Sequence, residues 1–190
     1  GTLTVSLVAI QALRNVLASP AAAAAPPTAV TVDIGSLQLA PALKTDPDVG
    51  EVFVEIDLVD IGNRAELTTQ RVRKTAIPLD FRYQHAVTIA PGSAEQTTLR
   101  KVMDSTDEQE ADVYFELKTT DRKRQDVQIG QGFLNLKQLL NQGRDFTALP
   151  VKLQGRESSV AGTLTTSIIA LQALRNAVAS ATPVEPPTAI

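Results

Sequence analysis

The two ends of this chain carry nearly the same sequence, and that duplication limits how the chain can fold. Residues 1–19 read GTLTVSLVAIQALRNVLAS and residues 162–180 read GTLTTSIIALQALRNAVAS, which differ at six of nineteen positions. The match continues beyond a variable spacer, because PPTAV at residues 26–30 recurs as PPTAI at residues 186–190. The period is 161 residues at the glycines and 160 at the prolines. Solenoid units repeat every 20–50 residues or so, and each repeat here is therefore expected to fold around its own core.

The duplication also predicts domain boundaries. Residues 1–19 are expected to be the closing strand and helix of a preceding repeat, and residues 20–28 an alanine- and proline-rich linker. The complete domain is predicted at residues 29–180, and residues 181–190 begin the next linker or repeat. Because prolines favour an extended, semi-rigid chain, neighbouring repeats are expected to be separated by a short spacer.

Residues 1–19 carry an apolar strand face, Leu3, Val5 and Leu7, followed by apolar residues at helical spacing. Since they match residues 162–180 closely, they are expected to fit the corresponding place in any copy of the domain. Strand edges accept such additions readily, so contact between neighbouring repeats is predicted.

Alternation of apolar and polar residues predicts a series of short β-strands. Residues 30–40 form the first, with a change of parity at Gly35-Ser36 that is typical of a bulge. The clearest alternation runs from Glu51 to Asp60, with Phe53 on the face expected to lean toward solvent. Further strands are expected at residues 71–77, 81–89, 112–119 and 127–134, with Phe115 and Phe133 at core positions.

Helical signals are few. A turn of helix is predicted at residues 136–140, closed by Gly143, whereas residues 95–103 are interpreted as a connector. The strand at residues 164–168 is expected to run into a short helix that ends near Val178. Many short strands with one or two short helices indicate an all-β fold, an antiparallel β-sandwich.

Three stretches resemble a known family. They are VGEVFVE at residues 49–55, IGQGFLNL at 129–136 followed by QGRD at 142–145, and GTL at 162–164 with ALQAL at 170–174. In these stretches the sequence resembles the C2 domains of the retinitis pigmentosa GTPase regulator-interacting proteins, especially their C-terminal regulator-binding domain. The resemblance implies a C2-type sandwich in a cytoplasmic, cilium- or flagellum-associated scaffold. Its implied partners are neighbouring copies of the repeat and ciliary proteins, although a near-identical array departs from the family's pattern.

Composition disfavours several functions. The chain has no cysteine, so disulfides and thiolate metal sites are excluded, and its net charge of -3 gives no reason to expect nucleic acid or an anionic membrane. His85 is the only histidine, and the Gly130-x-Gly132 pair lacks the third glycine of a dinucleotide fingerprint, so a bulge or a close strand crossing is the preferred interpretation. We predict no enzyme activity, no catalytic residue, no cofactor and no metal.

Calcium is the ligand to test in any C2 domain, because loop carboxylates at one end supply its oxygen ligands. The candidate carboxylates are Asp46, Asp48, Asp121 and Asp126. Arg122, Lys123 and Arg124 lie between the last two and would oppose a bound cation. The domain is therefore predicted to act independently of calcium.

The sequence also offers a basic patch as a candidate binding site. Its candidates are Arg71, Arg73, Lys74, Arg122, Lys123 and Arg124, which suit a protein partner or anionic lipid headgroups. Nearby carboxylates, such as Asp107 and Asp112, favour a mixed, solvated surface instead. A calcium- or lipid-responsive membrane-binding domain remains the alternative to a scaffold.

Repetition itself allows two roles. Each repeat is either a spacer that adds length to a strut, or an independent binding module whose repetition raises avidity.

Overall fold

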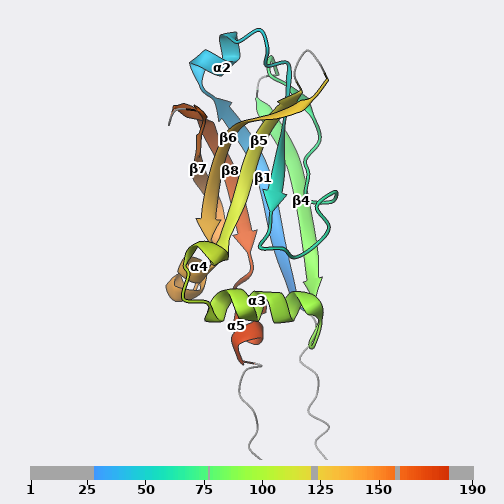
Figure 1. The fold of residues 1–190 in the computed structure, drawn as a ribbon, viewed down its shortest axis with the longest axis vertical. Helices are drawn as coiled ribbons and strands as arrows, with labels where there is room; N and C mark the ends of the chain where they lie inside the picture. The colour runs from blue at the N-terminus through green and yellow to red at the C-terminus, as the bar shows by residue number, and fades with distance from the viewer. Residues whose placement is uncertain (1–27, 77, 121–123, 157–158, 180–190) are drawn as a thin grey trace, which may run out of the picture.

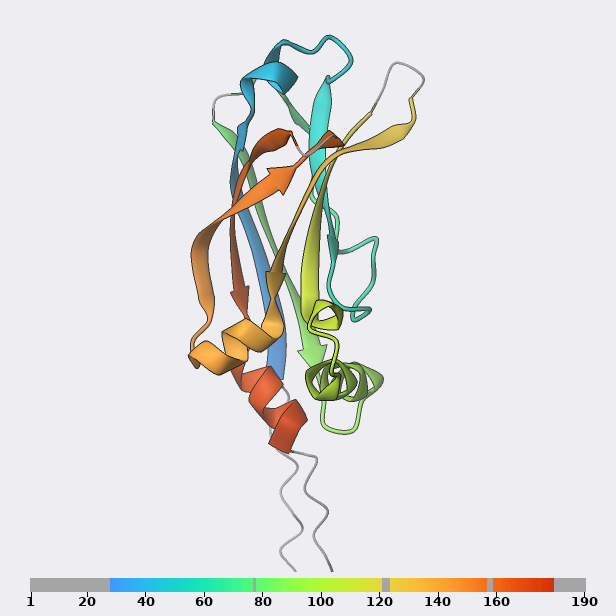
Figure 2. The same cartoon turned by 60° about the vertical axis from the view of Figure 1, so that its left-hand side comes forward.

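The computed structural model describes residues 28–76, 78–120, 124–156 and 159–179, and these form an antiparallel β-sandwich (Figure 1). Eight strands are hydrogen-bonded in the order β3-β2-β5-β6-β7-β8-β1-β4. One layer contains β2 (Glu51–Asp57), β3 (Val72–Arg73), β5 (Asp112–Thr120) and β6 (Asp126–Asn135). The other contains β1 (Thr28–Leu39), β4 (Leu79–Ile89), β7 (Phe146–Gln154) and β8 (Val160–Ile169). Figure 2 shows the two layers facing each other.

Among the described strands, backbone pairing joins the two layers along one edge, where β6 meets β7. The ladder between these strands has a single register pair, Gln131 with Gln154. By contrast, β5 pairs with β6, and β7 with β8, over most of their lengths. The hydrogen-bonded sheet is therefore continuous, but the ladder between β6 and β7 consists of this one pair.

The core lies between the layers and is built from the inward residues of each strand. On β5 these are Val113, Phe115 and Leu117, all fully buried. Val30, Val32 and Ile34 of β1, in the other layer, are equally buried and belong to the same core. Each such side chain contributes about 1.5–3 kcal/mol when it leaves water, so alternation along the strands specifies the sandwich.

Helices gather at the two ends of the sandwich (Figure 1). The helices α3 (Ala94–Asp104), α4 (Leu136–Gln142) and α5 (Leu171–Ala179) lie at one end, and α2 (Pro41–Thr45) lies at the other. A 3-10 turn at Gln109–Ala111 precedes β5. The helical content is larger than expected, because the predicted connector at 95–103 is the helix α3. Ser93 caps this helix: its Oγ accepts a hydrogen bond from the backbone N–H of Gln96.

Most of the predicted strands are confirmed. The strands expected at residues 30–40, 81–89, 112–119 and 127–134 are β1, β4, β5 and β6, and the pairing of β1 with β4 shifts register between Ile34 and Ser36, where a bulge was expected. The helical turn that ends at Gly143 is α4, and that glycine has a left-handed φ of 66°. The strand that runs into a helix is β8 followed by α5.

Four local features differ from what the sequence predicted. The strand expected at residues 71–77 is reduced to the two residues of β3, and β7 was not predicted. Phe53 faces outward as expected but is only 4% exposed, because Arg71 stacks on its ring. Phe133 does not lie in the core: it is 55% exposed.

The predicted boundaries cannot all be compared with this fold. The expected tail of a preceding repeat (1–19), nearly all of the expected linker (20–28) and the expected next linker (181–190) lie outside the described residues. Of the predicted domain at 29–180, the structure describes all but Ile77, residues 121–123, residues 157–158 and Ser180.

Candidate protein-binding site

The predicted basic patch is largely occupied by contacts within the domain. Arg71 Nη1 and Nη2 donate to the Asp126 carboxylate at 3.0 and 2.9 Å, and its guanidinium carbon lies 4.1 Å from the centroid of the Phe53 ring. Hydrogen bonding to Asp126 raises the pKa of Arg71, and hydrogen bonding to Arg71 lowers the pKa of Asp126. Arg71 thus fastens the segment before β3 to the end of β6.

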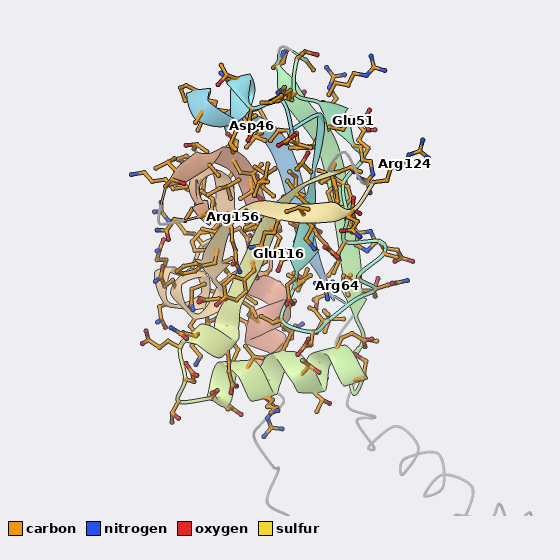
Figure 3. All side chains as sticks on the ribbon, turned by 45° about the horizontal axis from the view of Figure 1, so that its top comes forward. Asp46, Glu51, Arg64, Glu116, Arg124 and Arg156 are labelled. Carbon is orange, nitrogen blue, oxygen red and sulfur yellow. The ribbon has the colours of Figure 1, made fainter. Side chains whose placement is uncertain are left out.

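The remaining basic candidates are dispersed. Arg73 Nε lies 3.9 Å from the Glu51 carboxylate, and Lys74 Nζ donates to the backbone carbonyl of Asp46. Arg124 is exposed and lies at the edge of the molecule in Figure 3. Arg122 and Lys123 fall outside the residues that the structure describes. Three of the four described cations therefore contact acidic groups or a backbone carbonyl of their own chain.

The calcium candidates do not form one cluster among the described residues. Asp46 and Asp48 lie after α2, where Asp46 Oδ1 accepts a hydrogen bond from the Asp48 amide at 2.8 Å, whereas Asp126 is paired with Arg71. Asp121 is not among the described residues. Within the described ranges no three acidic or histidine side chains form a group that could hold a metal ion.

Sequence reasoning missed a groove of about 720 Å³ where β6 meets β7. It is lined on the β5–β6 side by Tyr114, Phe133 and neighbouring residues of β6, and on the β7 side by residues from Pro150 to Arg156. We call it the β6–β7 groove.

Two glycines of β6 position this groove. Gly130 and Gly132 are buried and pair across the ladder with Leu117 and Phe115, whose large side chains share their face of the sheet. A Cβ on Gly130 would lie 2.6 Å from Ala161 Cβ, and one on Gly132 would lie 2.7 Å from the Lys152 carbonyl oxygen. The register also shifts beside Gly130, between Leu117 and Lys118. The close crossing and the bulge that the sequence indicated are thus both confirmed.

The same arrangement places an aromatic pair on the outer face of the sheet. Phe133 is directly opposite Tyr114 in the β5–β6 ladder, and their ring centroids are 5.9 Å apart. Burial raises the pKa of Tyr114, so its hydroxyl stays protonated, and it donates a hydrogen bond to Asp112 Oδ2 at 3.5 Å. The pair gives the groove an apolar wall with one polar atom.

The charged side chains that line the β6–β7 groove are basic. Lys152 and Arg156 are its charged lining residues, and Gln128, Gln131 and Gln154 supply neutral polar groups. No carboxylate is among the described residues that line it. This combination favours a partner segment with acidic and apolar side chains.

A second groove of about 640 Å³ adjoins the first and extends toward α2. Ile129 and Arg156 line both, and Figure 3 shows Arg156 and Asp46 at that end. Val160, 60% exposed, lines the second groove, and so do the carboxylates Asp46 and Asp48. The two grooves together form an extended surface, with Phe133 and Lys152 in the first groove, Arg156 where the two meet, and Asp46 and Asp48 in the second.

The other charged cluster lies on the outer face of β2 and β5. Lys118 Nζ contacts both Glu55 and Glu116, which are opposite each other in the ladder, and Arg64 Nε lies 3.0 Å from Glu55. Hydrogen bonding to Lys118 lowers the pKa of Glu55. The Lys118 ammonium offsets the repulsion between two carboxylates that lie opposite each other on neighbouring strands. This cluster therefore stabilises the sheet and needs no bound partner to explain it.

Comparison with known proteins identifies the family. Residues 26–180 match the family described as retinitis pigmentosa G-protein regulator interacting C-terminal. The chain belongs to this family. A solved C2 domain-containing protein from a putative elicitor-responsive gene is similar, with a TM-score of 0.49 and 8% identity over 88% of this chain and 97% of that one. No curated protein sequence matches the chain.

The stretches that resemble the regulator-interacting family prove to be structural. Gly143 ends α4, and Asp145 Oδ1 accepts hydrogen bonds from the amides of Ala170 and Leu171 at 2.8 and 2.9 Å, which caps α5. Ala173 and Leu174 of the ALQAL stretch are fully buried. Among the described helices none is long and apolar enough to span a bilayer.

Proposed function

We propose that this domain is a non-catalytic protein-binding module of a ciliary scaffold and that the β6–β7 groove holds its partner. The observation that carries the proposal is the exposed Phe133 beside the single-pair junction of two strands. Exposed apolar side chains next to unpaired strand edges are typical of surfaces that bind an extended segment.

The chemistry of the groove defines the partner segment. A strand that lies beside β6 or β7 would form backbone hydrogen bonds, place an apolar side chain against Phe133 and Tyr114, and bring carboxylates to Lys152 and Arg156. Membership of the regulator-interacting family supports a protein partner, and the family's name indicates the retinitis pigmentosa G-protein regulator as the first one to test. A cytoplasmic location at the cilium or flagellum belongs to this proposal.

The duplicated sequence at residues 1–19 and 162–180 supports a scaffold built from repeats of the domain. In such a scaffold each domain adds both length and one binding groove, so the strut and the binding module are compatible roles. Avidity then rises with the number of grooves that a partner can reach.

The test measures binding of the purified regulator protein to the wild-type chain and to Phe133→Ala by calorimetry. Loss of the exposed ring is expected to weaken binding about tenfold or more, as at a typical hot spot, while the thermal midpoint changes little. Ile169→Ala is the matched control, because Ile169 is 49% exposed but does not line the groove. Equal affinities for the wild type and Phe133→Ala would place binding elsewhere.

A calcium- or lipid-responsive membrane role is the alternative, and exposed Arg124 is the described residue that favours it. The proposed scaffold acts independently of calcium, so neither calcium nor a chelator should alter regulator binding. Sedimentation with phosphatidylserine vesicles, with and without calcium, separates the two functions. Strong calcium-dependent binding to vesicles would support the alternative.

A further inference from the structure

The strand β8 and the helix α5 occupy one continuous slot in the domain. β8 lies between β1 and β7 and pairs with both. α5 packs against α3, α4 and β1. The side chains that fill the slot are nearly all fully buried, and they are Leu164, Thr166, Ile168, Ala170, Ala173, Leu174 and Ala177, preceded by Gly162.

The duplicated segment at residues 1–19 reproduces these buried positions. At Gly162, Leu164, Ala170, Ala173 and Leu174 the corresponding residues are identical, namely Gly1, Leu3, Ala9, Ala12 and Leu13. The glycine is informative, because a Cβ at position 162 would lie 2.6 Å from the Gln38 carbonyl oxygen. A segment without glycine at this point would not fit against β1.

The polar contacts of the slot are also largely preserved. The Asp145 carboxylate caps backbone amides of Ala170 and Leu171, so it would cap any chain that follows the same path. Ser167 Oγ accepts a hydrogen bond from the Ala148 amide at 3.0 Å, and the corresponding residue is Ser6. These two contacts fix the end of the strand and the start of the helix.

Two substitutions weaken the fit of the duplicate. Thr166 Oγ1 donates to the Asp33 carbonyl oxygen at 2.7 Å, whereas the corresponding Val5 has no donor. Ala177 is fully buried and corresponds to Val16, whose extra methyl groups crowd the site. Residues 162–179 are therefore the preferred occupant, and residues 1–19 the weaker one.

The chain path allows the duplicate to reach the slot of its own domain. β1 begins, and α5 ends, at the same end of the sandwich (Figure 1). Eight residues, 20–27, connect the duplicate to Thr28 at the start of β1, and eight extended residues span up to about 26–29 Å. A tether of this length gives an effective concentration on the order of millimolar.

We propose that residues 1–19 are a second occupant of the β8–α5 slot, which they enter in the same chain when residues 162–179 leave it. The displaced β8–α5 segment is then free to enter the slot of another copy. This inference rests on the slot and the duplication, and it stands independently of the β6–β7 groove.

Paired substitutions in the full chain test the exchange. Leu164→Asp places a charge at a fully buried slot position, and Leu3→Asp does the same in the duplicate. The matched control is Leu153→Asp on β7, equally buried but with no duplicate. If exchange occurs, Leu164→Asp lowers the thermal midpoint by no more than about half as much as Leu153→Asp does, because the duplicate takes the slot. Leu3→Asp alone shifts the midpoint by under about 1 °C. The double variant Leu3→Asp with Leu164→Asp has a midpoint as low as that of Leu153→Asp. Equal losses for Leu164→Asp and Leu153→Asp, with no further effect of Leu3→Asp, would overturn the proposal.

Disulfide trapping gives a second readout that does not depend on a destabilised variant. The chain has no cysteine, and Asp33 is the register partner of Ser167, which corresponds to Ser6. Under oxidation Asp33→Cys with Ser6→Cys is expected to form an intramolecular disulfide several-fold faster than Asp33→Cys with Ser19→Cys. The Ser19 pair closes a shorter loop, so random collision would favour it instead. A Ser6 rate no higher than the Ser19 rate, or a disulfide found only in dimers, would overturn entry in the same chain.

Discussion

Gly132 allows β6 to approach β7 closely beside the β6–β7 groove. Its added Cβ would lie 2.7 Å from both the Lys152 carbonyl oxygen and Val151 Cγ1, so the backbone of β7 would have to move. Gly132→Ala is expected to lower the free energy of unfolding by about 1–3 kcal/mol, the usual cost of overpacking. Urea unfolding followed by circular dichroism measures the change. Gly50→Ala is the control, since a Cβ there meets nothing within 4 Å, and an equal loss for both variants would contradict the argument.

Residue-level prediction from sequence succeeded where a position depends on local parity and failed where it depends on a neighbour. Phe53 has the outward parity expected of it, but Arg71 covers its ring. Phe133 was predicted at a core position, whereas the inward positions of β6 opposite Phe115 and Leu117 are held by Gly132 and Gly130. A strand whose inward residues are glycines shows no apolar alternation on its true core face, so its exposed phenylalanine was misassigned.

The cap of α5 is the decisive contact at the level of elements. Asp145 lies before β7 and reaches the first amides of a helix that begins 26 residues later, and thereby couples the α4–β7 turn to the β8–α5 junction. Asp145→Ala is expected to reduce the free energy of unfolding by about 0.5–2 kcal/mol, the range for loss of an N-cap. Asp145→Asn keeps an acceptor oxygen and should retain most of that stability. Chemical unfolding of the wild type and the two variants measures these differences. Equal stability of Asp145→Ala and the wild type would show that Asp145 does not stabilise the start of α5.

Elements with regular alternation and clear ends were predictable. β5 has alternating apolar residues, and α4 ends at a glycine with positive φ, so both follow from local chemistry. β7 was missed because Pro150 interrupts its apolar pattern; the structure accommodates that proline on a strand that has only one register pair with β6. α3 was taken for a connector because it has only two buried apolar residues, Leu99 and Val102.

The arrangement of the whole molecule explains why the candidate site was not predictable. The β6–β7 groove depends on how two strands from different layers cross. Gly130 and Gly132 indicated a close crossing, but the sequence did not show which strand passes there or that Phe133 is exposed beside it. Conversely, the basic residues that are adjacent in sequence are dispersed by the fold: Arg71 turns toward Asp126, and Lys74 toward the loop at Asp46. The family resemblance was predictable, since its stretches at 142–145 and 170–174 cap and fill one end of the sandwich.

The ion pairs on the outer layer make the stability of the whole domain sensitive to acid. Hydrogen bonding to Lys118 lowers the pKa of Glu55 below its ordinary value of 4.5, and hydrogen bonding to Arg71 lowers that of Asp126 below 3.8. A carboxylate with a depressed pKa in the folded state stabilises the fold above its unfolded pKa. That contribution is lost as the pH falls below about 4.5 and through the lowered values. The domain is thus expected to lose stability on the acid side of this range.

Glu55→Gln isolates one part of that dependence. Because Glu55 is partly exposed, its removal should cost about 0.2–1 kcal/mol at pH 7, and the difference from the wild type should vanish once Glu55 is protonated in both the folded and unfolded states. Urea unfolding between neutral and strongly acidic pH measures both curves. About 1 M NaCl should reduce the difference at neutral pH, because salt screens surface ion pairs. If the variant retained the full acid slope of the wild type, the Glu55–Lys118 pair would have no part in it, and Arg71–Asp126 would be the pair to test next.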